Sequence, residues 1–104
     1  MLSVEDLRKA VIAALSSIED PEIPINIYDL GLVYELRIVP PGVVTVFMTL
    51  TTPGCAVAQS LPAMVETTVA RVPGVQAVHV EIVWDPPWSR ERMSVQAKWQ
   101  MEML

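Results

Sequence analysis

The sequence is poor in metal-binding and nucleophilic side chains, with one cysteine, Cys55, and one histidine, His79, among its 104 residues. A lone cysteine cannot form an internal disulfide. No second cysteine sits at metal-site spacing, so a closed structural zinc site within one chain is excluded. The sequence also lacks a glycine-rich phosphate loop, which argues against a nucleotide or dinucleotide enzyme.

Basic residues are scarce as well. The chain has 7 lysines and arginines against 12 acidic residues, a net charge of −5, and no basic run. Nucleic-acid binding needs clustered lysine and arginine, and an acidic surface is poorly suited to anionic membranes. We therefore expect neither nucleic acid nor a membrane as a partner.

A stretch without any charged residue runs from Ile38 to Val65 and has to be tested as a membrane span. Prolines, glycines and threonines interrupt it, so no run of about 20 apolar residues remains. The first ten residues carry acids where a secretory signal needs basic residues and then an apolar core. These features predict a cytoplasmic protein.

The chain is long enough for one hydrophobic core, so residues 1–104 are expected to form a single domain. Its elements follow from periodicity, capping residues and prolines. The sequence predicts a helix over 4–17 after a cap at Ser3, a proline-rich loop, strands over 32–39 and 43–51, a helix over 56–72, a strand over 75–84, and a terminal helix capped by Ser89 or Ser94.

This order, helix-strand-strand-helix-strand-helix, is typical of a two-layer α/β (α+β) domain with helices packed on a small mixed three-stranded sheet. The short Pro40-Pro41-Gly42 connection makes the first two strands an antiparallel hairpin. The third strand can pair with either of them. The apolar faces expected to be buried are Leu32, Tyr34, Leu36 and Ile38; Val44, Val46, Met48 and Leu50; Val57, Leu61, Met64, Val65, Thr68 and Val72; and Val78, Val80, Ile82 and Trp84.

The cysteine lies in an unusual setting, because Cys55 follows Pro53-Gly54 and precedes helical sequence. At a helix N-terminus, unpaired amides and the helix dipole favour thiolate over thiol and lower the pKa of a cysteine. The alternative is that Cys55 is a small buried apolar residue. Asp20, Glu22 and Asp29 lie in the proline-rich loop, where carboxylates bind a metal, act as a base, or are simply solvated.

Four motifs, DPEIPINIYDLGLVYEL, VTVFMTLTTPGC, VPGV and VWDPPWSRERMS, occur in this order. Together they closely resemble the small iron-sulfur cluster assembly family that includes SufT and the eukaryotic cytosolic iron-sulfur targeting subunit. PaaD is also similar but carries a cysteine-rich tail that is absent here. The resemblance implies that the loop with Asp20 and Glu22 approaches the TTPGC turn. It also implies a site made of Asp20, Asp29, Thr51, Thr52 and Cys55, with Cys55 as the reactive or metal-ligating residue and the threonines as supporting groups.

By this resemblance the cofactor is a transiently bound iron-sulfur cluster, and the partners are the assembly machinery and client apo-proteins. A thiolate is a soft ligand suited to such clusters, but a cluster usually binds several thiolates. The others would come from a second chain in a homodimer, from outside thiols such as glutathione, or from a client. We expect a protein that is not an enzyme. A pure adaptor without metal, and a thiol enzyme with Cys55 as nucleophile, stay as alternatives.

Overall fold

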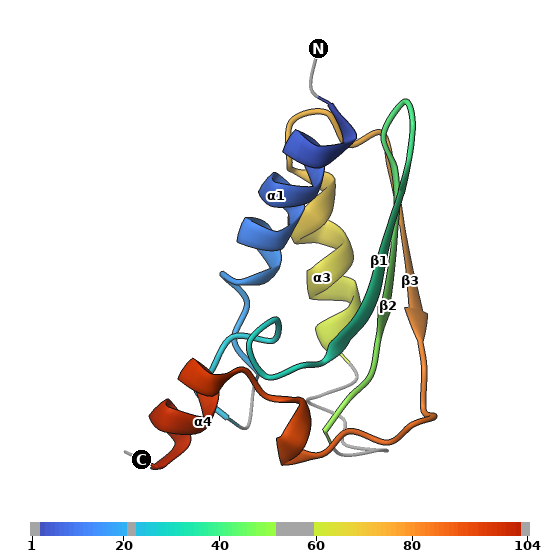
Figure 1. Ribbon diagram of the computed structural model, residues 1–104. Coiled ribbons are helices and arrows are strands. Elements are labelled where there is room, and N and C mark those ends of the chain that lie inside the picture. Colours follow the sequence, from blue (N-terminus) through green and yellow to red (C-terminus); the bar gives the residue numbers. More distant parts are fainter. Residues whose placement is uncertain (1–2, 21–22, 52–59, 103–104) are drawn as a thin grey trace.

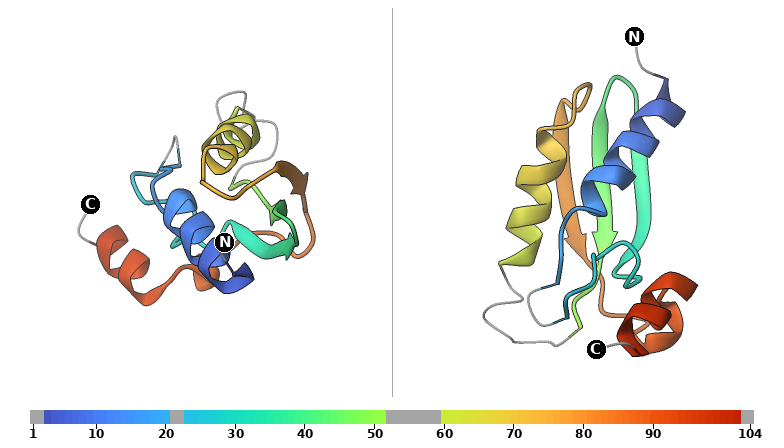
Figure 2. Two further views of the ribbon diagram at one scale, coloured as in Figure 1. Left: turned by 90° about the horizontal axis from the view of Figure 1, so that it is seen from above. Right: turned by 90° about the vertical axis from the view of Figure 1, so that its left-hand side faces the viewer.

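The computed structural model describes residues 3–20, 23–51 and 60–102. Helices α1 (Val4–Leu15) and α3 (Leu61–Ala70) cover one face of a sheet made of β1 (Val33–Val39), β2 (Val43–Met48) and β3 (Ala77–Ile82), as Figures 1 and 2 show. A short 3-10 helix, η1 (Arg90–Arg92), and helix α4 (Val95–Glu102) follow. The predicted two-layer architecture and element order are confirmed.

The strand order is β1-β2-β3. β1 and β2 are antiparallel, whereas β3 pairs with β2 in parallel, with Val44 opposite Val78. The sheet is therefore mixed, as predicted. The sequence left open which strand of the hairpin pairs with the third strand. In the structure the crossover through α3 places β3 beside β2, and β1 forms the other edge of the sheet.

The alternation of inward-facing and outward-facing side chains changes near the start of β1. Val33 pairs with Met48 and Glu35 pairs with Phe47, so Tyr34 falls at an irregularity in the register. Such a bulge inserts one residue and shifts the side-chain alternation. Val33 therefore packs against the core, whereas the Tyr34 hydroxyl donates a hydrogen bond to the Pro86 carbonyl oxygen at 2.7 Å. The prediction that Tyr34 belongs to the buried face was wrong.

β3 packs Val78, Val80 and Ile82 against the core, as expected, but the strand ends at Ile82. The chain then leaves the sheet, after Val83 N–H donates to the Met48 carbonyl. Trp84 is consequently 48% exposed, and the prediction that it points inward was wrong.

Helix α1 begins as predicted, with the Asp6 N–H donating to Ser3 Oγ at 3.0 Å. It ends at Leu15, two residues earlier than expected. The hydroxyl of Ser16 donates to the Ile12 carbonyl and that of Ser17 donates to the Ala14 carbonyl, so these serines bond to the last turn of the helix.

In α3, Pro62 lies in the first turn, where a missing backbone N–H costs little. The helix therefore needs no proline kink. Leu61, Val65 and Val69 are buried, but Met64 is 50% exposed, so its predicted inward position was wrong. The predicted start of this helix over residues 56–59, with Val57, lies outside the described residues.

Of the two caps considered for the last helix, Ser94 is the one used, because the Ala97 N–H donates to Ser94 Oγ at 3.0 Å. Met93 and Ala97 are buried in the hydrophobic core. None of the helices in the described part of the chain is long and apolar enough to cross a membrane.

The connecting segments 16–20, 23–32 and 83–94 and the chain leaving β2 gather at one end of the domain, to which the carboxyl ends of β2 and β3 point (Figures 1 and 2). Backbone bonds join them: Thr49 N–H donates to the Leu32 carbonyl, and Ser94 N–H donates to the Asp29 carbonyl, each at 2.8 Å. The fold thus brings several of the sequence-predicted site residues to the same end of the molecule.

Candidate functional site

The loop that carries Asp20 is a narrow antiparallel turn. Ile27 N–H donates to the Ile18 carbonyl, and Asp20 N–H donates to the Ile25 carbonyl. The Asp20 side chain is only 5% exposed, and its Oδ2 accepts a hydrogen bond from Ile23 N–H at 3.0 Å. Asp20 thus closes the turn. Glu22 lies outside the described residues.

Asp29 is held by a different set of bonds. Its Oδ2 accepts from Asn26 Nδ2 at 2.8 Å, and its N–H donates to Asn26 Oδ1 at 2.9 Å. Its carbonyl oxygen accepts from Ser94 N–H, which ties the loop to the start of α4. The two predicted carboxylates therefore bond to different neighbours, and each has a clear structural role.

Thr51 and Thr49 lie on the chain that leaves β2. The Oγ1 atoms of both threonines are buried and have no hydrogen-bond partner within residues 3–20, 23–51 and 60–102. A buried polar atom without a partner is uncommon and calls for an explanation. The sequence motifs indicated Thr51 but not Thr49, because strand alternation places Thr49 with Thr45 and Phe47 on the solvent side. The sequence feature that could have indicated Thr49 is the cluster of threonines at 49, 51 and 52.

A pocket of about 430 Å³ lies against these threonines. Its lining comes from the chain after β2 and the segment after β3: Thr49, Leu50, Thr51, Trp84, Pro87 and Trp88. Thr52 and Cys55 lie outside the described residues. Cys55 follows Thr51 by four positions, so the chain holds their Cα atoms within about 14 Å of each other.

The other candidate groups are distributed elsewhere. His79 is exposed, and it alternates with Val78 and Val80, which pack against the core, so its side chain lies on the sheet face away from the helices. Within the described part of the chain, no group of three or more His, Cys, Asp or Glu side chains is arranged to hold a metal ion.

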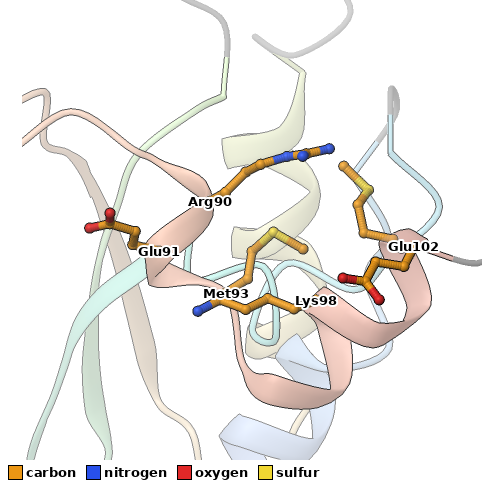
Figure 3. A pocket seen from close by; sticks show the side chains of 6 residues that line it. Arg90, Glu91, Met93, Lys98 and Glu102 are labelled. Carbon is orange, nitrogen blue, oxygen red and sulfur yellow. The ribbon is translucent and has the colours of Figure 1, made fainter.

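A second pocket of about 300 Å³ lies between η1 and α4. Figure 3 shows that Glu91 points away from Arg90 and Met93. Two basic and two acidic side chains line it, with two methionines: Arg90, Lys98, Glu91, Glu102, Met93 and Met101. Because this lining has no net charge, it does not favour an ion of either sign.

Comparison with known proteins identifies the family. The family described as "Iron-sulfur cluster assembly protein" matches residues 8–82, from within α1 to the end of β3. The chain belongs to this iron-sulfur cluster assembly family. The matched range contains Cys55 and the carboxylates Asp20, Glu22 and Asp29. It stops before the WDPPW segment, although that segment packs on the same end of the domain.

Individual relatives agree with this assignment. The Fe-S protein maturation auxiliary factor SufT of Staphylococcus aureus is 46% identical over 79 residues, which cover 76% of this chain and 90% of that protein. An iron-sulfur cluster carrier protein of Mycobacterium leprae is 38% identical over 77 residues, which cover 74% of this chain but only 20% of the carrier. The crystal structure of a DUF59 domain from Bacillus anthracis superimposes with a TM-score of 0.88 at 35% identity, covering 96% of this chain and 95% of that one.

These likenesses confirm the predicted family, the fold and a role in iron-sulfur cluster assembly and protein maturation. The predicted site of Asp20, Asp29, Thr51, Thr52 and Cys55 stays a prediction.

Proposed function

We propose that this iron-sulfur assembly protein binds a cluster transiently through Cys55 and hands it to client apo-proteins. The observation that carries the proposal is the family match over residues 8–82, which includes the only thiol of the chain. A thiolate is the protein ligand that iron-sulfur clusters prefer. A cluster held by few protein ligands is easily released, which suits a carrier better than a permanent redox centre.

The residues near the turn fit this role. Thr51 precedes Cys55 by four positions, and its buried Oγ1 has no partner in the described part of the chain. We propose that this hydroxyl donates to a sulfur or oxygen ligand of iron when a cluster is bound, because hydrogen bonds from neighbouring groups orient metal ligands. Asp20 is buried at the same end of the domain and adds a carboxylate to the proposed site.

Thiolate ligands beyond Cys55 have to come from outside one chain, since the sequence has no other cysteine. A homodimer contributes a second Cys55 across its two-fold axis, and a small thiol or a client cysteine completes the set. We therefore include partner proteins and a homodimer in the proposal. We also propose that the protein acts in the cytoplasm.

An adaptor that brings clients to the machinery without holding metal is the main alternative. A thiol enzyme is less well supported, because its base would have to be His79, and this side chain lies on the outer face of β3. We propose that the chain is not an enzyme.

Anaerobic reconstitution with iron and sulfide tests the proposal. We expect visible cluster absorbance and bound iron in the wild type, loss of both in Cys55→Ser, and a dimer mass only in the loaded wild-type protein. Thr45→Val serves as the matched control, because Thr45 lies on β2 opposite His79 and away from the turn. Absence of a cluster in wild type favours the adaptor.

A further inference from the structure

The two edge strands of the sheet, β1 and β3, differ in how their outer edges are protected. An unpaired strand edge offers N–H and C=O groups to any extended chain, so proteins commonly cover it with charged side chains or distort it with bulges. β1 has both protections: its register is irregular at Tyr34, and Arg8 Nη1 donates to the Leu36 carbonyl oxygen at 2.8 Å. In the described part of the chain β3 has neither. It pairs regularly with β2 from Ala77 to Ile82 and contains no proline, lysine or arginine.

Three residues of β3 point their backbone groups away from β2. Val83 N–H donates to the Met48 carbonyl oxygen at 2.8 Å, so the odd-numbered residues of this segment face β2. Backbone groups alternate along a strand, and those of Val78, Val80 and Ile82 therefore point to the outer edge. No hydrogen bond joins these outward groups to another described residue. This free edge of β3 is a template for one more strand.

A second copy of the chain does not fit the free edge through its own β3. Helix α3 packs against β3 and lies over this side of the sheet (Figure 2). Neighbouring strands are about 4.8 Å apart, whereas the axes of packed helices need about 8–10 Å. Two β3 strands side by side would therefore bring two α3 helices too close together. The free edge suits a strand that carries no helix on this face.

The side chains around the free edge define the chemistry of such a strand. On the inner face, beneath α3, the new neighbours would be Val78, Val80 and Ile82, which are only partly buried and favour apolar side chains. On the outer face they would be His79 and Glu81, which are exposed. Because the chain has a net charge of −5, basic side chains are favoured over acidic ones there.

We propose that the free edge of β3 binds an extended segment of a partner protein, in which apolar residues alternate with polar and basic ones. Backbone bonds supply the affinity and the alternating side chains supply the preference. Backbone bonds depend little on sequence, which suits a factor that serves several clients. That the segment belongs to a client or to the assembly machinery rests on the proposed function, whereas the free edge itself does not.

The test uses the full-length, metal-free protein and the peptide acetyl-Lys-Val-Thr-Val-Thr-Val-Lys-amide. Hydrogen exchange of the backbone N–H groups is followed by NMR. With saturating peptide we expect exchange at Val78, Val80 and Ile82 to slow by about tenfold or more, the effect of one net hydrogen bond at each. Exchange at His79 and Glu81, whose N–H groups face β2, should change less. Unchanged exchange at the three outward groups would overturn the proposal.

Two N-methylated forms of the peptide test backbone pairing directly. One carries the methyl groups on its valine nitrogens and the other on its threonine nitrogens, with the same side chains in both. A paired strand points alternate N–H groups toward its neighbour, so one form should bind about tenfold or more weakly than the other. Equal affinities would show that backbone pairing does not hold the peptide, which contradicts the proposal.

Val80→Pro removes one outward N–H, and proline is tolerated in an edge strand where the N–H faces solvent. Val80→Ala keeps the N–H and is the matched control. We expect the proline variant to bind the peptide at least about fivefold more weakly than the alanine variant. Equal binding would overturn the assignment. If Val80→Pro does not fold, the N-methylated peptides decide the question alone.

Two further measurements identify the occupant. A dimer of the metal-free protein that protects the three outward N–H groups would make the occupant a second copy and contradict the partner claim; sedimentation should show none. At equal cluster loading, transfer to an apo-ferredoxin should be slower from Val80→Pro than from Val80→Ala, and equal rates would contradict a client as the partner. Failure of the wild type to load a cluster would overturn the proposed function and leave the peptide result standing.

Discussion

The indole Nε1 of Trp88 donates a hydrogen bond of 2.7 Å to the backbone carbonyl oxygen of Leu30, 58 positions earlier in the chain. Leu30 precedes Leu32, whose carbonyl oxygen accepts from Thr49 N–H. The C-terminal segment is thus bonded, through the loop before β1, to the chain that leads from β2 toward Cys55.

Trp88→Phe removes the indole donor and keeps an aromatic ring. Leu30 is fully buried, so its carbonyl would lose its partner without gaining water. We expect the free energy of unfolding to fall by about 1–3 kcal/mol, measured by urea denaturation. Trp84→Phe is the control, since this indole is half exposed, and it should change stability by no more than about 0.5 kcal/mol. Equal losses in the two variants would contradict the role of the Trp88 bond.

The two serines that precede the C-terminal elements offer a matched pair. Ser94→Ala removes the side-chain acceptor of the Ala97 N–H and should cost about 1 kcal/mol in thermal or urea unfolding. Ser89 precedes η1 and makes no capping bond with its side chain. Ser89→Ala should therefore be close to neutral, and an equal or larger loss there would argue against Ser94 as the cap.

Gly31→Ala tests the close approach of the C-terminal segment to the loop. Gly31 has φ +81°, and a Cβ there would lie 2.2 Å from the Arg92 carbonyl oxygen. Both the backbone conformation and the contact exclude a side chain, so we expect a loss of about 2 kcal/mol or more. Gln96→Ala, at an exposed site on α4, is the control and should be nearly silent. A stable Gly31→Ala protein would show that the two segments can separate.

Asp20 combines a structural role with a proposed ligand role, and two substitutions separate them. Asp20→Ala leaves Ile23 N–H without its acceptor and should cost about 1–2 kcal/mol. Asp20→Asn keeps an oxygen for that bond and should cost less. Iron content after reconstitution is then compared between wild type and Asp20→Asn under conditions in which both are fully folded. Iron lost in Asp20→Asn supports the ligand role, whereas normal iron assigns Asp20 to the turn alone.

The sequence predicted the layers, the element order and most of the core, because helical and strand periodicity records which face is buried. The predicted burial of side chains was wrong where one residue changed the alternation along a strand or where a strand ended. The irregularity at Tyr34 moved Val33 into the core. The end of β3 at Ile82 left Trp84 in solvent, although the alternation pattern continued through it.

Site prediction depended on long-range contacts that periodicity does not record. The motifs located Asp20, Asp29 and Thr51, but not that the carboxylates are engaged in turn and loop bonds. Thr49 was missed because it follows the solvent-side phase of β2. It is 1% exposed and lines the same pocket as Trp84 and Trp88, which come from a distant part of the chain. The expected helix start beside Cys55 lies outside the described residues.

Cluster transfer tests the central claim most directly. Wild-type protein loaded anaerobically is mixed with an apo-ferredoxin in the presence of an iron chelator, and holo-ferredoxin is followed by circular dichroism. Our account predicts transfer that resists the chelator and is lost with Cys55→Ser, because the cluster passes between thiolates without release of free iron. Transfer that the chelator abolishes, or that Cys55→Ser supports at the wild-type rate, would contradict the account.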